Sequence, residues 1–117
     1  MKWAGGKYKL IEVINAKLPQ AKKLIEPFVG AGSVFLNTDY SKYVLNDINP
    51  DLINLYNIVK HQSTDYITDS AKLFTSDYNE EKRYYQMRLE FNNSEDIYER
   101  AVYFLYLNRH GYNGLCR

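Results

Sequence analysis

The chain has 117 residues, of which 45% are apolar and 25% are charged, and its formal net charge is +1. This is the composition of an ordinary soluble globular chain, either one small domain or part of a larger one. No apolar run approaches the roughly 18 residues of a membrane helix and no signal peptide is present, so we expect a cytoplasmic protein. The single cysteine, Cys116, excludes an internal disulfide.

The charge is unevenly distributed along the chain. Residues 1–23 carry six lysines and one glutamate, for a net charge of +5, and residues 24–99 carry six basic and thirteen acidic side chains, for −7. Residues 100–117 carry three arginines and no acid, for +3. Two basic ends around an acidic middle are compatible with a local polyanion site, although solvated helix faces explain the same segregation.

The first sixty residues are predicted to alternate between helix and strand. The predicted elements are a helix over 8–18 closed by Pro19, a buried strand over 24–29, a short helix over 33–40, a buried strand over 43–45 and a helix from Pro50 to about Val59. Asn49 precedes Pro50 and suits the N-cap of that last helix.

Beyond residues 58–64 the pattern becomes helical. Helices rich in Tyr, Phe and Leu are predicted over 65–75, 79–92 and 95–108. Ser94 is expected to cap the last of them, with two acids in its first turn. Gly111 and Gly114 then interrupt the helical pattern in a loop or tight turn.

The stretch Glu-Pro-Phe-Val-Gly-Ala-Gly-Ser at 26–33 follows the first predicted strand. Glycines after a strand let a ligand approach the backbone, and Asp47 after the second strand is placed to accept hydrogen bonds from ribose hydroxyls. A dinucleotide loop needs a third glycine three residues after Gly32, where Phe35 stands, so a nicotinamide-dependent oxidoreductase is disfavoured. A cofactor with a ribose and no phosphate, such as S-adenosylmethionine, fits better, and a purely structural turn remains the alternative.

Two further segments combine cations, aromatic rings and glycines. They are Lys-Trp-Ala-Gly-Gly-Lys at 2–7 and Asn-Arg-His-Gly-Tyr-Asn-Gly-Leu-Cys-Arg at 108–117. In the second segment Arg can bind guanine bidentately, Asn can read adenine, and Tyr can stack where a base is displaced. Taken singly, a flexible N-terminus and a surface turn explain these segments as well.

In their order and spacing these segments resemble the Dam-type family of DNA adenine-N6 methyltransferases. The resemblance rests on KWAGGK at 2–7, EPFVGAGSVFLNTD at 26–39, NDIN at 46–49, DLINLYNIVK at 51–60 and AVYFLYLNRHGYNGLCR at 101–117. It implies an α/β fold, namely a Rossmann-like S-adenosylmethionine-dependent methyltransferase core with a largely helical target-recognition insertion. It also implies methyl transfer from S-adenosylmethionine to adenine N6 in double-stranded DNA, typically within GATC.

Matched position by position, the resemblance implies two groups of site residues. Those expected to bind the cofactor are Trp3, Lys7, Phe28, Gly30, Gly32 and Asp47. Those expected to contact DNA are Lys2, Arg109, Tyr112, Asn113, Leu115 and Arg117, with Tyr112 filling the stack as the adenine flips out. No metal is expected. Residues 1–60 would form the cofactor-binding part, and 61–117 the start of the recognition domain, truncated in its hairpin.

One motif of the family is missing from the sequence. Catalysis in the family uses Asp-Pro-Pro-Tyr, whereas the prolines here are Pro19, Pro27 and Pro50. We therefore expect an N-terminal fragment whose catalytic motif would lie beyond Arg117 and which is inactive alone, with a non-catalytic cofactor- or DNA-binding fragment as the alternative. The resemblance places it with the nucleoid of a bacterial or phage-infected cell, in replication, repair or restriction-modification.

Overall fold

The computed structural model describes residues 1–116, so Arg117 lies outside the described residues. The chain divides into two compact units. One comprises Trp3–Ile48 and is called the strand unit below. The other comprises Met1–Lys2 together with the chain from Asn49 onward and is called the helical unit. Each unit is described by itself.

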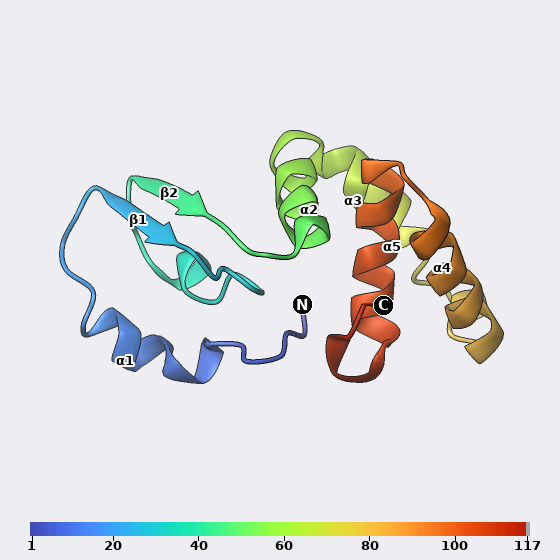
Figure 1. Ribbon diagram of the computed structural model, residues 1–117, viewed down its shortest axis with the longest axis horizontal. Coiled ribbons are helices and arrows are strands. Elements are labelled where there is room, and N and C mark those ends of the chain that lie inside the picture. Colours follow the sequence, from blue (N-terminus) through green and yellow to red (C-terminus); the bar gives the residue numbers. More distant parts are fainter. Residues whose placement is uncertain (117) are drawn as a thin grey trace. The chain divides into compact units, whose positions relative to one another are not determined.

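The strand unit is built around two parallel strands. Its elements in chain order are the 3-10 turn η1 (Tyr8–Leu10), helix α1 (Ile11–Asn15), strand β1 (Lys23–Glu26), the 3-10 turn η2 (Phe35–Asn37) and strand β2 (Lys42–Leu45). Strands β1 and β2 point the same way, with Glu26 opposite Leu45 in the register (Figure 1). Because the strands are parallel, the glycine loop after β1 and Asp47 after β2 leave from the same, carboxyl edge of the sheet.

The prediction of one buried strand over 24–29 is wrong in extent and in burial. Strand β1 ends at Glu26, because Pro27 has no backbone N–H to donate to the ladder. The side chain of Phe28 is 75% exposed, and that of Ile25 is 62% exposed. Pairing resumes only at Val29, whose N–H donates to the Asn46 carbonyl oxygen at 2.8 Å. The chain therefore turns at Pro27 and Phe28 before it enters the glycine loop.

The two helices predicted in this unit are much shorter than expected. The helix predicted over 8–18 is the turn η1 followed by the five residues of α1, which lacks a side-chain cap at its start. The helix predicted over 33–40 is the single turn η2. Thr38 ends it, because its hydroxyl hydrogen-bonds the carbonyl oxygens of Val34 and Phe35 at 3.0 and 3.3 Å and so competes with helix continuation.

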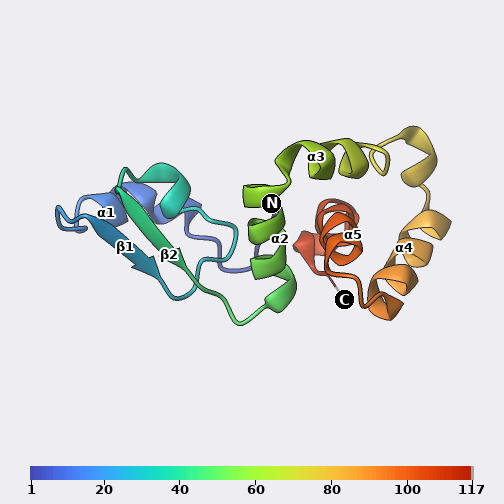
Figure 2. The same ribbon diagram turned by 90° about the horizontal axis from the view of Figure 1, so that it is seen from above.

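The helical unit packs its helices around a central one. Its elements are α2 (Pro50–His61), α3 (Ser63–Ala71), η3 (Ser76–Tyr78), α4 (Glu81–Asn93), α5 (Ile97–His110) and η4 (Tyr112–Gly114). Helix α5 contacts α2, α3 and α4, which surround it in the view along its axis (Figure 2). The helices predicted from the apolar pattern are confirmed, with ends shifted by a few residues.

Capping residues determine where two of these helices begin. The predicted start of α2 is confirmed, because the Asn49 side chain accepts the Leu52 N–H at 3.2 Å and Pro50 follows it. The predicted cap of α5 is wrong. Asp96, not Ser94, is the N-cap, and its carboxylate accepts the Glu99 N–H at 2.8 Å. A charged oxygen at the helix start interacts more favourably with the helix dipole than a hydroxyl does.

A single arginine joins three helices of this unit. The Arg100 guanidinium donates two parallel hydrogen bonds to Asp51 of α2, Nε to Oδ1 at 2.8 Å and Nη2 to Oδ2 at 2.9 Å. Its Nη1 donates to the carbonyl oxygens of Phe91 and Ser94, and the group lies 4.3 Å from the centre of the Phe91 ring. Bidentate geometry makes this the strongest kind of ion pair. None of the helices in residues 1–116 has the length and apolarity to span a membrane.

Candidate functional site

A cavity of about 250 Å³ opens at the carboxyl edge of the parallel strands. Its lining residues are Trp3, Ala4, Gly5, Gly6, Lys7, Phe28, Val29, Gly30, Ser33 and Asp47. Of the residues predicted to bind a cofactor, all but Gly32 line this cavity. Gly32 is buried instead and shapes the loop, with φ at +78° and its N–H donating to the Val29 carbonyl oxygen at 2.9 Å.

The indole of Trp3 explains why residue 30 is a glycine. Gly30 has a φ of +51°, in the left-handed region that favours glycine. A Cβ atom at Gly30 would lie 2.9 Å from Cδ1 and 3.0 Å from Nε1 of Trp3. Because real Cβ atoms do not approach other atoms so closely, any side chain at Gly30 would displace the indole. The absence of a side chain at Gly30 therefore leaves space for the Trp3 indole of the same chain.

Asp47 holds the glycine loop from the second strand. Its Oδ2 atom accepts the Gly30 N–H at 3.0 Å, so the carboxylate fixes the loop against the carboxyl end of β2. Sequence reasoning assigned this acid to a ribose only. The structure adds an anchoring role, and a carboxylate has enough acceptor positions for both.

An ion pair between the partly exposed Lys7 and the buried Glu26 lies beside the cavity. Lys7 lines the cavity, and its Nζ donates to the Phe28 carbonyl oxygen at 2.6 Å and lies 3.9 Å from Oε1 of Glu26. Glu26 is buried; its Oε2 accepts the Phe35 N–H at 3.3 Å, while Oε1 has no hydrogen-bond partner. Burial raises the pKa of Glu26, and the Lys7 charge lowers that pKa by less. Sequence reasoning missed Glu26, although an acid inside the strand predicted over 24–29 was the available signal.

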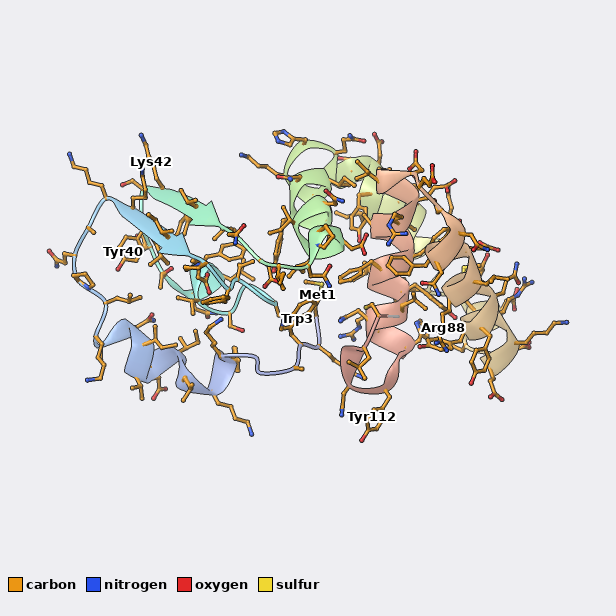
Figure 3. The ribbon with its side chains drawn as sticks, viewed as in Figure 1. Met1, Trp3, Tyr40, Lys42, Arg88 and Tyr112 are labelled. Atoms are coloured by element: carbon orange, nitrogen blue, oxygen red, sulfur yellow. The ribbon has the colours of Figure 1, made fainter. Side chains whose placement is uncertain are left out.

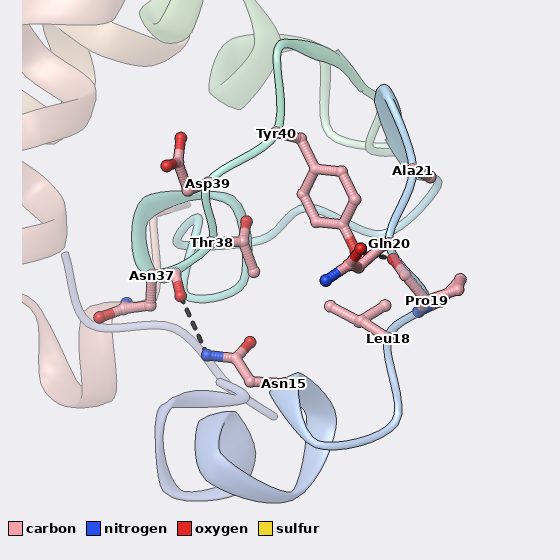
Figure 4. Close-up of a pocket in the computed structure, with 9 residues that line it drawn as sticks. All are labelled: Asn15, Leu18, Pro19, Gln20, Ala21, Asn37, Thr38, Asp39 and Tyr40. Atoms are coloured by element: carbon pink, nitrogen blue, oxygen red, sulfur yellow. Dashed lines mark hydrogen bonds between the residues drawn. The ribbon is translucent and has the colours of Figure 1, made fainter.

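A larger cavity, of about 520 Å³, lies elsewhere in the strand unit (Figure 4). It is lined by Asn15, Leu18, Pro19, Gln20, Ala21, Asn37, Thr38, Asp39 and Tyr40. Several of its polar groups bond one another: Asn15 Nδ2 donates to the Asn37 carbonyl oxygen at 3.0 Å, and the Tyr40 hydroxyl to that of Pro19 at 2.8 Å. The segments before β1 and β2 form it, whereas open α/β sheets bind ligands at the carboxyl ends of their strands. The smaller cavity is therefore the candidate site.

The second candidate region is the turn that follows α5. The backbone N–H of Gly111 donates to the Leu107 carbonyl oxygen at 2.7 Å and closes the helix. Tyr112 is 82% exposed, and its ring points away from the turn (Figure 3). Asn113 has a φ of +52°, which is uncommon for a residue other than glycine and keeps the turn tight. The turn thus presents an exposed aromatic ring that can stack on another planar group.

The N-terminal residues of the helical unit are linked to this turn through the side chain of Asn108, in the last turn of α5. The Lys2 N–H donates to Oδ1 of Asn108 at 3.0 Å, and the Lys2 carbonyl oxygen accepts from Asn108 Nδ2 at 2.7 Å. The same Nδ2 donates to the Gly114 carbonyl oxygen at 3.0 Å. The structure therefore brings Lys2 to the turn that carries Tyr112. Sequence reasoning included Asn108 in the segment 108–117 but gave it no part in holding Lys2; the signal was an amide at an otherwise apolar position of α5.

The contact of Lys2 with Asn108 and Gly114 is called the junction below. Arg109 and Leu115 are the chain neighbours of Asn108 and Gly114, and both are exposed. His110 makes a structural contact, because its ring stacks on Tyr106 at 4.1 Å and its Nε2 lies 3.0 Å from Oδ1 of Asn79. Burial raises the pKa of the Cys116 thiol to about 11, so the thiol is protonated at neutral pH and is a poor nucleophile. The assignment of Arg117 to DNA falls outside the described residues.

A parallel strand pair with a glycine loop and an acid at its carboxyl edge is typical of α/β proteins that bind nucleoside-containing ligands. The family model for D12 class N6 adenine-specific DNA methyltransferases matches residues 3–117, and the chain belongs to this family.

Curated proteins align with the whole chain. It is 60% identical over 117 residues to the DNA adenine methylases of Salmonella typhi and Serratia marcescens, and 54% identical to that of Vibrio cholerae. All of this chain is covered, but it spans only 42–43% of the length of these relatives.

Proposed function

We propose that the protein carrying this chain transfers the methyl group of S-adenosylmethionine to adenine N6 in double-stranded DNA, within GATC. In this proposal the chain supplies part of a Rossmann-like core, with cofactor binding in residues 1–60 and the start of the DNA-recognition domain in 61–117. The observation that carries the proposal is the cavity at the carboxyl edge of β1 and β2, whose lining includes Trp3, Lys7 and Asp47. Family membership over residues 3–117 supports the reaction class.

The residues at this cavity fit S-adenosylmethionine. The exposed ring of Phe28 and the indole of Trp3 offer apolar surface to an adenine, and Asp47 offers carboxylate oxygens to ribose hydroxyls. Lys7 offers a cation to a carboxylate. The cavity of about 250 Å³ is smaller than the roughly 300–1,000 Å³ of typical ligand sites, so these residues would form one part of the site.

This chain's contribution to the reaction is positioning. When bound, S-adenosylmethionine supplies an electrophilic methyl group. Asp47 and the Gly30 loop would hold the nucleoside end of the cofactor, and Tyr112 would occupy the space that a flipped adenine leaves in the duplex. We assign no catalytic residue to the chain. In the proposed reaction the methyl group passes directly and in line from the sulfonium to N6, and N6 loses a proton. The chain's part in this reaction is limited to the positioning groups named above.

The reaction is tested with the protein expressed from its complete reading frame. We expect methyl incorporation from labelled S-adenosylmethionine into a duplex that contains GATC. The control is the same duplex with its GATC adenines already N6-methylated, which should accept no label. An unmethylated GATC duplex that accepts no label, or equal labelling of both duplexes, would contradict the proposal.

The role of Asp47 is tested by a variant that separates its two contacts. Asp47→Asn keeps an oxygen that can accept the Gly30 N–H but loses the charge offered to the ribose. We expect a folded protein whose affinity for S-adenosylmethionine falls by roughly tenfold, about 1.4 kcal/mol. Asp47→Ala should lose the loop anchor as well and bind more weakly still. Unchanged cofactor affinity in both variants would remove Asp47 from the site.

The chain by itself is proposed to bind without transferring the methyl group. Its sequence contains no Pro-Pro pair, and hence no Asp-Pro-Pro-Tyr. On the strand unit, Ile25 and Val44 are neighbours in the register, and their side chains are 62% and 47% exposed. Parallel sheets are normally covered on both faces, which favours further structure over these strands in the active protein. Methyl transfer by the 117-residue chain alone would contradict this proposal.

A further inference from the structure

The side chain of Asn108 lies fully buried at the end of α5, with 0% of its surface exposed. It meets one donor, the Lys2 N–H, and two acceptors, the carbonyl oxygens of Lys2 and Gly114. A primary amide offers an acceptor oxygen and two N–H donors, so all three contacts are satisfied in one orientation only. The flipped amide would set its nitrogen against an N–H and its oxygen against two carbonyls.

The steric environment of Gly114 supports the same junction. Gly114 has a φ of +76°, and a Cβ atom there would lie 2.7 Å from both Cβ and the carbonyl oxygen of Lys2. It would also lie 2.9 Å from Nδ2 of Asn108. The backbone of Lys2 and the turn are therefore in direct contact, with no space for a side chain between them. Asn108 and Gly114 hold Lys2 by its backbone and leave its side chain exposed.

The groups that this junction gathers have the chemistry of a DNA-contacting surface. The exposed ammonium of Lys2 and the exposed guanidinium of Arg109 are cations, and the Tyr112 ring is 82% exposed. Cations bind phosphates and base edges, and an aromatic ring stacks on a base. Residues 100–117 contain no acid that would repel a phosphate backbone.

We propose that Asn108 is a positioning residue for DNA recognition, which fixes the N-terminal Lys2 to the Tyr112 turn so that both contact one stretch of duplex. The inference rests on the proposed function and adds to it a residue that touches no DNA itself. Lys2 reaches the duplex in a defined place because its backbone is hydrogen-bonded on both sides of the residue. Without the amide, the backbone of Lys2 would lose both of its hydrogen bonds to Asn108 and would no longer be held at the turn.

The test is a double-mutant cycle measured by duplex binding with the protein expressed from its complete reading frame. Lys2→Ala removes the cation but keeps the backbone contacts, whereas Asn108→Asp replaces the donor Nδ2 with an oxygen facing two carbonyl oxygens. Alone, Lys2→Ala should weaken GATC duplex binding by about fivefold, or about 1 kcal/mol. In the Asn108→Asp background it should change binding by less than about twofold, because Lys2 is no longer positioned. An equal factor in both backgrounds would overturn the inference and leave Asn108 a purely structural residue.

Two further variants keep the test decisive. Asn57→Asp makes the same chemical change at an exposed position of α2 and should leave both the binding and the effect of Lys2→Ala unchanged. If Asn108→Asp does not fold, Gly114→Ala replaces it, because a Cβ at Gly114 would clash with Lys2 and with Nδ2 of Asn108 and so break the same contact from the side of the turn. It should abolish the Lys2→Ala effect in the same way, and an unreduced effect would overturn the inference.

The failure of the proposed function is distinguishable from the failure of this inference. If the unaltered protein binds no GATC duplex, the proposed function fails, and the role of Asn108 in recognition fails with it. The hydrogen bonds between Asn108 and Lys2 are then tested separately, by NMR hydrogen exchange. If exchange of the Lys2 amide is slow in the unaltered protein and in Asn57→Asp but fast in Asn108→Asp, these hydrogen bonds are supported without the role in DNA binding. Fast exchange in the unaltered protein would contradict them.

Discussion

The two compact units are stabilised in different ways. Of the fourteen buried apolar side chains in residues 1–116, twelve belong to the helical unit, and only Val29 and Val34 belong to the strand unit. The helical unit is organised by packing around α5 and by the Arg100 ion pair. The strand unit instead positions its cavity through glycine conformation and a few hydrogen bonds, such as that from the Gly30 N–H to Asp47. We therefore expect the cavity of the strand unit to be sensitive to changes at its glycines, and the helical unit to be sensitive to changes in its packing and its largely buried ion pair.

The largest expected effect is on the stability of the helical unit. Arg100→Ala removes a bidentate partner of Asp51 and leaves the acid, whose side chain is 16% exposed, without its counter-ion. Breaking a largely buried pair on one side should lower the free energy of unfolding by about 3 kcal/mol. The measurement is urea unfolding followed by circular dichroism.

The matched control breaks an exposed pair in the same unit. Lys72 pairs with Asp69 at 2.6 Å, but their side chains are 69% and 40% exposed. Lys72→Ala should therefore cost less than about 1 kcal/mol. Equal losses for Arg100→Ala and Lys72→Ala would show that burial does not distinguish the two pairs.

The next effect is on the strand unit, where a comparison of two glycines tests the contact with Trp3. Gly30→Ala and Gly5→Ala both place a side chain at a positive φ, of +51° and +71°. Each should cost about 1 kcal/mol in backbone strain. Only Gly30→Ala also clashes with Trp3, since no atom lies within 4 Å of a Cβ at Gly5. We therefore expect about 2 kcal/mol for Gly30→Ala.

Fluorescence separates the two variants independently of stability, because Trp3 is the single tryptophan of the chain. Displacing the indole from Gly30 should shift its emission in Gly30→Ala and leave it unchanged in Gly5→Ala. Identical spectra and identical unfolding energies for the two variants would contradict the close approach of Trp3 to the loop.

The smallest expected effect concerns the pH dependence of stability. Burial raises the pKa of Glu26 above its unfolded value, so the folded state binds a proton more tightly. The contribution of Glu26 to the stability of the folded state is therefore fully present below the pKa of Glu26 in the unfolded chain. It is lost as the pH rises through the raised pKa that Glu26 has in the folded chain. Glu26→Gln should flatten this part of the stability profile and change stability at pH 7 by no more than about 1 kcal/mol. An unaltered profile in Glu26→Gln would assign the pH dependence to other groups.

The helical unit was the more predictable from the sequence, and the physical reason is periodicity. Apolar spacing in 95–108 and the Asn49-Pro50 pair report directly on a buried helix face and a helix start. The N-cap of α5 was predicted at Ser94 and lies at Asp96. Both residue types are good caps and they stand two positions apart, so the apolar spacing alone does not decide between them. The DNA-contact residues there came from the resemblance and remain predictions.

The strand unit was predictable in its chemistry and less so in its shape. The residue types of the glycine loop and Asp47 indicated the cavity, since parallel strands bring their carboxyl ends together. The exposure of Phe28, the brevity of η2 and the contact of Trp3 with Gly30 depend on local hydrogen bonds and on residues 27 positions apart. The contact of Asn108 with Lys2 was missed for the same reason, because the two residues lie at opposite ends of the sequence.

The most direct test of the account measures both ligands on one variant from each unit, in the protein expressed from its complete reading frame. Gly30→Ala should weaken S-adenosylmethionine binding by about tenfold and leave duplex binding without cofactor nearly unchanged. Tyr112→Ala should weaken GATC duplex binding by roughly five- to a hundredfold, the loss of about 1–3 kcal/mol of stacking, and leave cofactor affinity unchanged. Equal loss of both ligands in both folded variants would contradict a division into a cofactor-binding part and a DNA-recognition part.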